Sequence, residues 1–167
     1  MQYSVGDKVV HPRHGPGWVA GIENRAILAG TKGYYVIEIP AQGLTLRIPV
    51  GRADEVGMRP AMSQARFPRV LTMLGGTPHT LPENYRERQE RIGAQLRTGR
   101  VMQLARLVRD LTWHRKQSHL TRVDSEYLKQ GRDLLAAEMS LVSGDTVLDT
   151  GRLIDSTMAA AMASRLG

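Results

Sequence analysis

An aromatic residue followed by several arginines marks the part of the sequence best suited to contact a nucleic acid. The residues are Tyr85, Arg86, Arg88 and Arg91. Arginine carries a planar fork of N–H donors that matches phosphate oxygens, and a tyrosine ring offers a flat apolar face on which a base can stack. These residue types at this spacing indicate contact with the backbone and bases of a nucleic acid.

The same segment has two other interpretations. Tyr85 lies seven residues before Ile92, which lies four residues before Leu96, so the tyrosine could instead pack in a helical core. The arginines could also form an ordinary solvated helix surface. Glu87 and Glu90 are interleaved with them, so phosphate contacts here would be weaker than the number of arginines alone implies.

The distribution of charge along the chain favours a nucleic acid or an acidic protein surface as partner. The formal net charge is +7 and the isoelectric point is near 10.2. Residues 61–132 hold 14 Lys and Arg against 6 Asp and Glu, and 12 of those cations are arginine. The flanking blocks carry +2 (residues 1–60) and −3 (residues 133–167). The middle block is therefore the expected electrostatic footprint of the partner.

The sequence contains no recognisable set of catalytic residues. Cysteine is absent, as are the Gly-x-Ser-x-Gly, phosphate-loop and His-Glu-x-x-His motifs. His11 and His14 flank Pro12 at a spacing that could ligate a metal, but no third ligand of suitable type clusters nearby. We expect hydrogen-bonding histidines in a turn, and no catalytic residue, metal, cofactor or small-molecule substrate. An enzyme with an unfamiliar site is a remote alternative.

The sequence shows no sign of export or membrane insertion. Its first residues lack the basic and apolar regions of a secretory signal, and no run of about 18 apolar residues follows. The absence of cysteine suits a reducing compartment. We therefore expect a cytoplasmic protein with no membrane partner.

Short apolar, β-branched segments separated by glycine-containing turns predict a small antiparallel β-barrel in residues 1–60. The segments are residues 8–10, 18–20, 34–39 and 44–50, with turns at 14–17, 29–33 and 42–43. Connections this short join antiparallel neighbours. Leu44, Leu46 and Ile48 alternate with Arg47, so we expect the apolar side chains to be buried and Arg47 to point outward.

A helical pattern replaces the β pattern beyond Gly57. We expect a first helix from near Ser63 or Phe67 to Leu74, further helices at residues 84–96, 101–112 and 121–141, and a last one capped by Asp145 or Thr146. Asn84 and Thr121 are the expected N-caps, and Gly99 and Gly144 the expected ends. In the third helix we expect Trp113 in the core, and Arg109 and Asp110 on other faces. The predicted fold class is α+β: a β-barrel at residues 1–60, then an all-helical domain at residues 63–164.

Several segments carry a likeness to a known family that covers roughly residues 5 to 141. They read VGDKVVHPRHGPG (5–17), YYVI (34–37), LRIPV (46–50), VGMR (56–59), TPH (77–79) and VRDL (108–111). These segments resemble the CarD/CdnL family of bacterial transcription regulators. The resemblance implies a Tudor-like barrel that binds the β subunit of RNA polymerase, and a helical domain that meets the upstream edge of the transcription bubble.

The resemblance also implies roles for individual residues. Arg25 and Arg47 fall where the family uses basic residues against the polymerase, and Ile27 lies on the same strand as Arg25. Tyr85 occupies the position where many members have a tryptophan that wedges against the unpaired edge of the bubble, and its smaller ring implies a weaker wedge. The arginines implied to contact DNA phosphates are Arg86, Arg88 and Arg91.

The resulting hypothesis is a monomeric, non-enzymatic transcription regulator. It would bind the RNA polymerase β subunit and stabilise the promoter open complex through sequence-tolerant contacts with promoter DNA at the upstream fork. The alternative hypothesis is an adaptor on RNA polymerase whose helical domain recognises another protein and never contacts DNA. Salt-dependent binding to forked DNA distinguishes the two.

Overall fold

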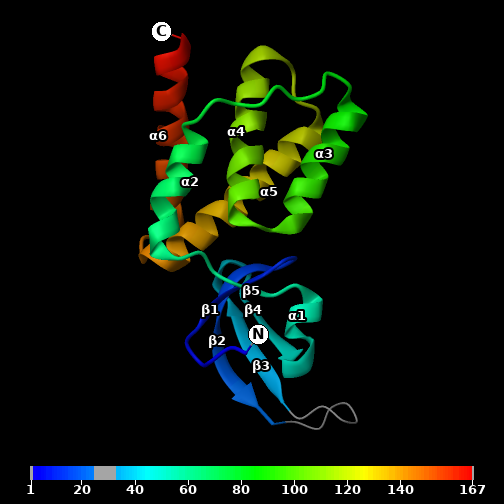
Figure 1. Cartoon of the computed structure of the whole chain (residues 1–167), viewed down its shortest axis with the longest axis vertical. Coiled ribbons are helices and arrows are strands. Elements are labelled where there is room, and N and C mark those ends of the chain that lie inside the picture. Colours follow the sequence, from blue (N-terminus) through cyan, green and yellow to red (C-terminus); the bar gives the residue numbers. More distant parts are fainter. Residues whose placement is uncertain (1, 25–32, 167) are drawn as a thin grey trace. The chain divides into compact units, whose positions relative to one another are not determined.

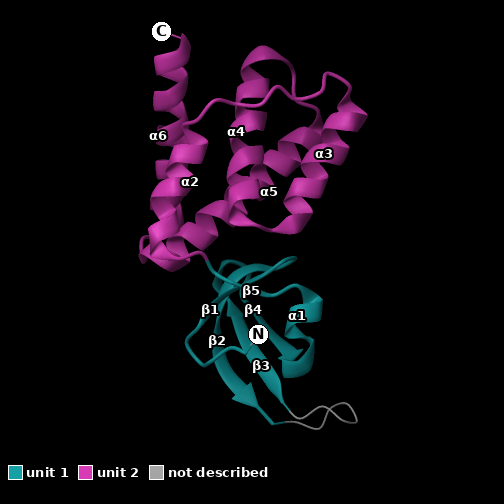
Figure 2. Cartoon of the chain, in the orientation of Figure 1, with its two compact units in different colours: residues 1–61 teal, residues 62–167 magenta. Residues whose placement is uncertain are grey.

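The computed structural model describes residues 2–24 and 33–166 (Figure 1). The chain divides into two compact units, residues 1–61 and residues 62–167 (Figure 2). The first unit is a β-sheet and the second is made of helices, so the α+β prediction is confirmed.

In its described residues, the first unit is a five-stranded antiparallel sheet with the order β4-β3-β2-β1-β5. The strands are β1 (Lys8–His11), β2 (Gly15–Glu23), β3 (Tyr34–Ile39), β4 (Leu44–Pro49) and β5 (Arg59–Pro60). Short 3-10 helices at Pro40–Gln42 and Val50–Arg52 and the one-turn helix α1 (Ala53–Val56) complete the unit. The sequence did not predict α1 or β5, because elements of four and two residues are too short to show a period.

The core of the sheet unit lies on one face, as the alternation in β4 predicts. Ile48 is buried, and Leu44 and Leu46 pack against the core, which includes Val9, Val19, Tyr35, Ile37 and Ile39. Gly17 is required for β2 to pair with β3, because a Cβ at this position would collide with the backbone oxygen of Glu38.

The β1–β2 turn is tighter than the sequence suggested, since β2 already begins at Gly15. The Nδ1 atom of His11 accepts hydrogen bonds from the backbone N–H groups of Arg13 and His14, both at 3.1 Å. The His11 and His14 ring centres are 4.7 Å apart. The prediction of hydrogen-bonding turn histidines is therefore confirmed for His11. Across the described ranges, no cluster of three His, Cys, Asp or Glu side chains is suited to hold a metal.

The second unit contains five α-helices and a short 3-10 turn at Gln64–Arg66. The helices are α2 (Phe67–Leu74), α3 (Tyr85–Thr98), α4 (Val101–Gln117), α5 (Arg122–Ser143) and α6 (Val147–Leu166). Helix α4 contacts α2, α3 and α5, and α6 contacts α5 and α2 (Figure 1). Trp113 is buried in α4, as predicted. No helix within residues 2–24 and 33–166 has the length and apolar character needed to cross a membrane.

The helix ends lie where the sequence places its capping residues. Asn84 and Thr121 cap α3 and α5 with their side chains, and Thr121 forms a full capping box with Asp124. Gly99 and Gly144 end the same two helices in the left-handed conformation, with φ of 63° and 82°. Glycine adopts this conformation without the steric cost of a Cβ.

Candidate nucleic-acid interface

The first turn of α3 is fixed by its cap and exposes Tyr85. The Asn84 side chain accepts from the backbone N–H groups of Arg86 at 3.0 Å and Glu87 at 3.1 Å, so the helix starts at Tyr85. Tyr85 is 48% exposed, whereas Ile92 and Leu96 of the same helix are buried. The alternative in which Tyr85 packs in the core with Ile92 and Leu96 is therefore wrong.

Tyr85 and Arg86 form one exposed aromatic and cationic pair. The Arg86 Nε–H donates to the Tyr85 hydroxyl at 3.1 Å, and the guanidinium carbon lies 5.6 Å from the ring centre. A cation held beside an aromatic ring offers hydrogen-bond donors for a phosphate next to a flat face on which a base can stack. This pair is the best candidate in the described residues for contact with an unpaired base and its phosphate.

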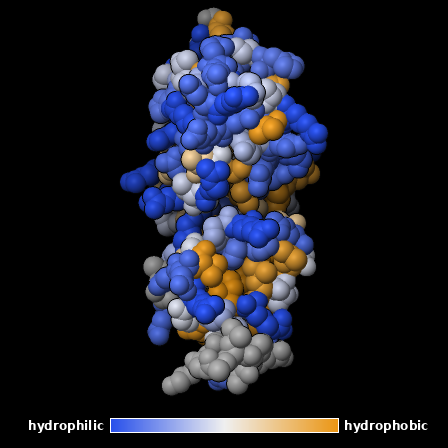
Figure 3. Space-filling view, turned by 90° about the vertical axis from the view of Figure 1, so that its right-hand side faces the viewer, coloured by the Kyte–Doolittle hydropathy of each residue, from blue (hydrophilic) through white to orange (hydrophobic). Residues whose placement is uncertain are grey.

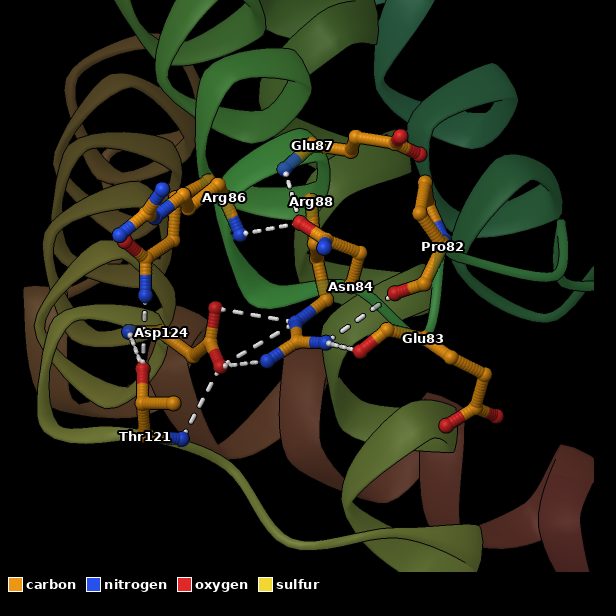
Figure 4. Close-up of polar contacts among 9 residues, drawn as sticks. Pro82, Glu83, Asn84, Arg86, Glu87, Arg88, Thr121 and Asp124 are labelled. Atoms are coloured by element: carbon orange, nitrogen blue, oxygen red, sulfur yellow. Dashed lines mark hydrogen bonds and ion pairs between the residues drawn. The ribbon is translucent and has the colours of Figure 1, made fainter.

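Arg88 is not on the surface, which corrects its expected role as a phosphate contact. It is only 3% exposed, and its guanidinium is held by polar groups on two sides (Figure 4). On one side Nε lies 3.2 Å from both carboxylate oxygens of Asp124, and Nη2 lies 2.7 Å from Asp124 Oδ2. On the other side Nη1 donates to the backbone oxygens of Pro82 at 3.0 Å and Glu83 at 3.1 Å. No donor of this guanidinium faces a DNA-accessible surface.

Asp124 joins this ion pair to the start of α5. Its Oδ2 accepts from the Thr121 backbone N–H at 2.9 Å, and the Thr121 hydroxyl accepts from the Asp124 backbone N–H at 3.1 Å. Burial would raise the pKa of Asp124, but the hydrogen bonds from Arg88 and Thr121 outweigh burial and hold this pKa below its ordinary value. The carboxylate is therefore ionised and paired throughout the neutral range.

Arg86 and Arg91 are both exposed but lie on different flanks of α3. At 100° per residue they are about 140° apart around the helix axis. Glu90 follows Arg86 by four residues, and Glu87 precedes Arg91 by four, so each arginine has a carboxylate on its own flank. The three arginines expected to contact phosphates therefore form no single basic surface: Arg88 is buried, and Arg86 and Arg91 lie on separate flanks, each with a carboxylate nearby. Arg86 is the arginine in contact with Tyr85 in the described residues.

A second buried ion pair holds the loop that leads to α3. Arg109 and Asp110 were expected on other faces of the helix than its apolar core residues, but both are buried, at 4% and 2% exposure. Arg109 Nε donates to Asp110 Oδ1 at 2.8 Å, and its Nη1 lies 3.4 Å from the backbone oxygen of Met73. Asp110 Oδ1 also accepts from the backbone N–H of His79 at 2.9 Å. The pair therefore ties α4 to the end of α2 and to the following loop.

The sheet unit presents Arg47 on the face opposite its core, as predicted. Arg47 pairs with Val36 across the β3–β4 ladder, and its Nε lies 3.2 Å from Glu23 Oε2, with 41% of the side chain exposed. Arg25 and Ile27 lie outside the described residues. Trp18, 37% exposed, shares this face, because it pairs with Glu38 two residues along β3 from Val36. In Figure 3 hydrophobic side chains gather on the visible surface of the sheet unit.

Comparison with known proteins identifies two family models that together cover most of the chain. The model described as "CarD-like/TRCF RID domain" matches residues 3–62. The model described as "CarD, C-terminal domain" matches residues 69–155. A protein of Bacillus subtilis (strain 168), named "Putative transcription factor YdeB", is 25% identical over 146 residues, which cover 86% of this chain and 94% of that protein.

Proposed function

Because this chain belongs to the CarD family of transcription regulators, which confirms the resemblance seen in its sequence, we propose that it stabilises the promoter open complex while bound to RNA polymerase. Its sheet unit is the Tudor-like domain of this family, and family membership implies an interaction with RNA polymerase. In this proposal the sheet unit binds the β subunit of the polymerase, and the first turn of α3 contacts the upstream fork of the promoter.

The observation that carries the proposal is the exposure of Tyr85 at the capped start of α3. A tyrosine that is 48% exposed, beside an arginine bonded to its hydroxyl, has an open ring face and a cation next to it. Stacking on an aromatic ring tolerates any base, because every base has a π-face. The Tyr85–Arg86 pair therefore suits an unpaired base at a fork without a preference for sequence.

For polymerase binding we propose the outer face of the sheet with Arg47, together with Arg25 and Ile27. Arg47 is exposed on this face, and Trp18 on the same face adds an aromatic side chain of the type that dominates many interfaces. The edge strand β4 also offers backbone groups for pairing with a strand of the partner.

The proposed mechanism requires only binding to the polymerase and to DNA, and no chemical step. Attachment to the polymerase raises the local concentration of the helical unit at the promoter, so a weak contact with DNA becomes effective. A contact that exists only when the fork is open then shifts the equilibrium toward the open complex.

The test is the lifetime of the promoter open complex after challenge with a competitor, with and without the full-length protein. We expect the protein to lengthen this lifetime, and to bind forked DNA more weakly as salt rises. An unchanged lifetime together with binding to polymerase would refute open-complex stabilisation and favour the adaptor.

A further inference from the structure

We propose that Arg88 and Asp124 form a positioning pair that fixes the direction of the Tyr85 ring. This inference rests on the proposed function, because it concerns how the wedge is presented to the fork. Neither residue would contact DNA; both would act through the backbone that carries Tyr85.

The pair holds the chain on both sides of Tyr85. Arg88 lies three residues after Tyr85 on α3, and its guanidinium binds the backbone oxygens of Pro82 and Glu83, just before the cap residue Asn84 (Figure 4). One side chain thus closes a loop around residues 82–88. The turn that places Tyr85 cannot rotate without breaking these bonds.

The anchor for this clamp comes from α5, far along the chain. Asp124 holds Arg88 through both carboxylate oxygens and is itself fixed by the capping box with Thr121. The Gln89 side chain donates to the Thr121 hydroxyl at 2.9 Å, which adds a second link between the same two helix starts. These contacts therefore fix the position of the first turn of α3 relative to the first turn of α5.

The hydrogen bond that Tyr85 makes through its side chain gives the ring little support. Tyr85 is half exposed, and its hydroxyl bonds to Arg86, which is also exposed. The backbone that carries Tyr85 therefore contributes to the direction of the ring. An arginine suits this site because its five N–H donors are spread over three nitrogens in a rigid fork and reach a carboxylate on one side and two carbonyls on the other. All three donors of a lysine lie on one nitrogen.

A buried ion pair contributes little to the stability of the folded state compared with apolar residues of similar size. Replacing such a pair with apolar residues is often neutral or stabilising, because desolvation of the charges offsets their attraction. An arginine and an aspartate that are 3% and 0% exposed therefore point to a need for geometry.

The first test measures the turn directly by amide hydrogen exchange on the full-length protein. The variant is Arg88→Lys, and the control is Arg132→Lys, which loses a comparable bidentate contact with Asp155 between α5 and α6. We expect the Arg86 and Glu87 amides to exchange roughly tenfold faster in Arg88→Lys, the effect of losing about two net hydrogen bonds, and to be unchanged in the control.

The second test is a double-mutant cycle on open-complex lifetime. Arg88→Lys should shorten the lifetime by about two- to tenfold, since a misdirected ring cannot lose more than the whole stacking contribution. In a Tyr85→Ala background the same substitution should have no further effect on lifetime, although its effect on melting temperature should persist. A merely structural role would leave both effects in place.

A further variant guards against loss of folding in Arg88→Lys. Arg88→Met with Asp124→Asn removes both charges together and keeps an oxygen for the Thr121 N–H, so neither charge is left buried alone. We expect a melting temperature near that of the parent but a shortened lifetime.

The outcomes separate this inference from the proposed function. If Tyr85→Ala shortens the lifetime but Arg88→Lys and the double variant do not, the positioning role is overturned alone. If Tyr85→Ala leaves the lifetime unchanged, the proposed function fails and the positioning role fails with it.

Discussion

Truncation of Tyr85 should affect the promoter complex far more than the fold. Full truncation of a buried aromatic costs about 3–5 kcal/mol of stability. Tyr85 is 48% exposed, and its ring packs beside Arg86 with no place in the buried cores. We therefore expect Tyr85→Ala to lower the free energy of unfolding by about 1 kcal/mol or less.

The expected loss at the fork is larger than the loss of stability. A base stacked on an aromatic side chain is worth about 1–3 kcal/mol, so the open-complex lifetime should fall by roughly tenfold in Tyr85→Ala. The assay is competitor challenge of open complexes at saturating protein and fixed salt, with thermal unfolding measured in parallel. Leu148→Ala is the matched control, because Leu148 is a 64% exposed apolar residue on α6 of the same unit.

Tyr85→Trp tests the same site in the opposite direction. Its larger ring offers more stacking surface, and the exposed site leaves room for it, so we expect a longer lifetime and an unchanged melting temperature. A Tyr85→Ala protein that loses more than about 2 kcal/mol of stability with an unchanged lifetime would refute the wedge. A Trp variant that melts earlier and leaves the lifetime unchanged would refute it equally.

Three further outcomes follow from the described side chains. Arg47→Glu should abolish capture of the isolated polymerase β subunit with an unchanged melting temperature, and equal capture would mean that the polymerase surface lies elsewhere. Arg86→Gln should lower the slope of log affinity for forked DNA against log salt by about 0.9, whereas a parental slope would show that Arg86 contacts no phosphate. Burial, followed by the charges of His14 and Arg13, holds the pKa of His11 below its ordinary 6.5, so folding favours the neutral ring. Stability should be full above pH 6.5 and decline as the pH falls through the lowered pKa; His11→Asn, which keeps an acceptor, should remove this decline in pH-dependent melting.

Local signals allowed the ends of α3 and α5 to be predicted from the sequence, whereas α4 continues to Gln117, five residues beyond its predicted end at residue 112. Asn84, Thr121, Gly99 and Gly144 act within one turn of their own positions, so their roles do not depend on the rest of the fold. The alternation in β4 was equally informative, because its period of two places Arg47 opposite the core whatever the partner strand.

The burial of the two arginines could not be predicted in the same way, because it depends on contacts that are distant in the sequence. Arg88 binds Asp124, 36 residues away. Arg109 pairs with its neighbour Asp110, but its guanidinium also contacts the backbone oxygen of Met73, 36 residues away. One signal was nevertheless present: Arg88, Ile92 and Leu96 are spaced by four, so Arg88 continues the apolar stripe of α3. A charged residue in register with such a stripe predicts a buried ion pair more readily than a surface contact.

The modest charge around Tyr85 suits the proposed mechanism. Phosphates are present in closed and open promoters alike, so phosphate contacts strengthen binding to both states and leave their ratio unchanged. Unpaired bases occur only in the open state, so stacking on Tyr85 is the contact that discriminates. Glu87 and Glu90 offset the flanking arginines and so reduce the binding energy that is the same for the closed and the open promoter. The tether to polymerase compensates for this loss of affinity for DNA. Because the net charge next to Tyr85 is modest, the direction of the ring largely determines whether it meets the fork. A clamp from Arg88 to two carbonyls and Asp124 would fix this direction.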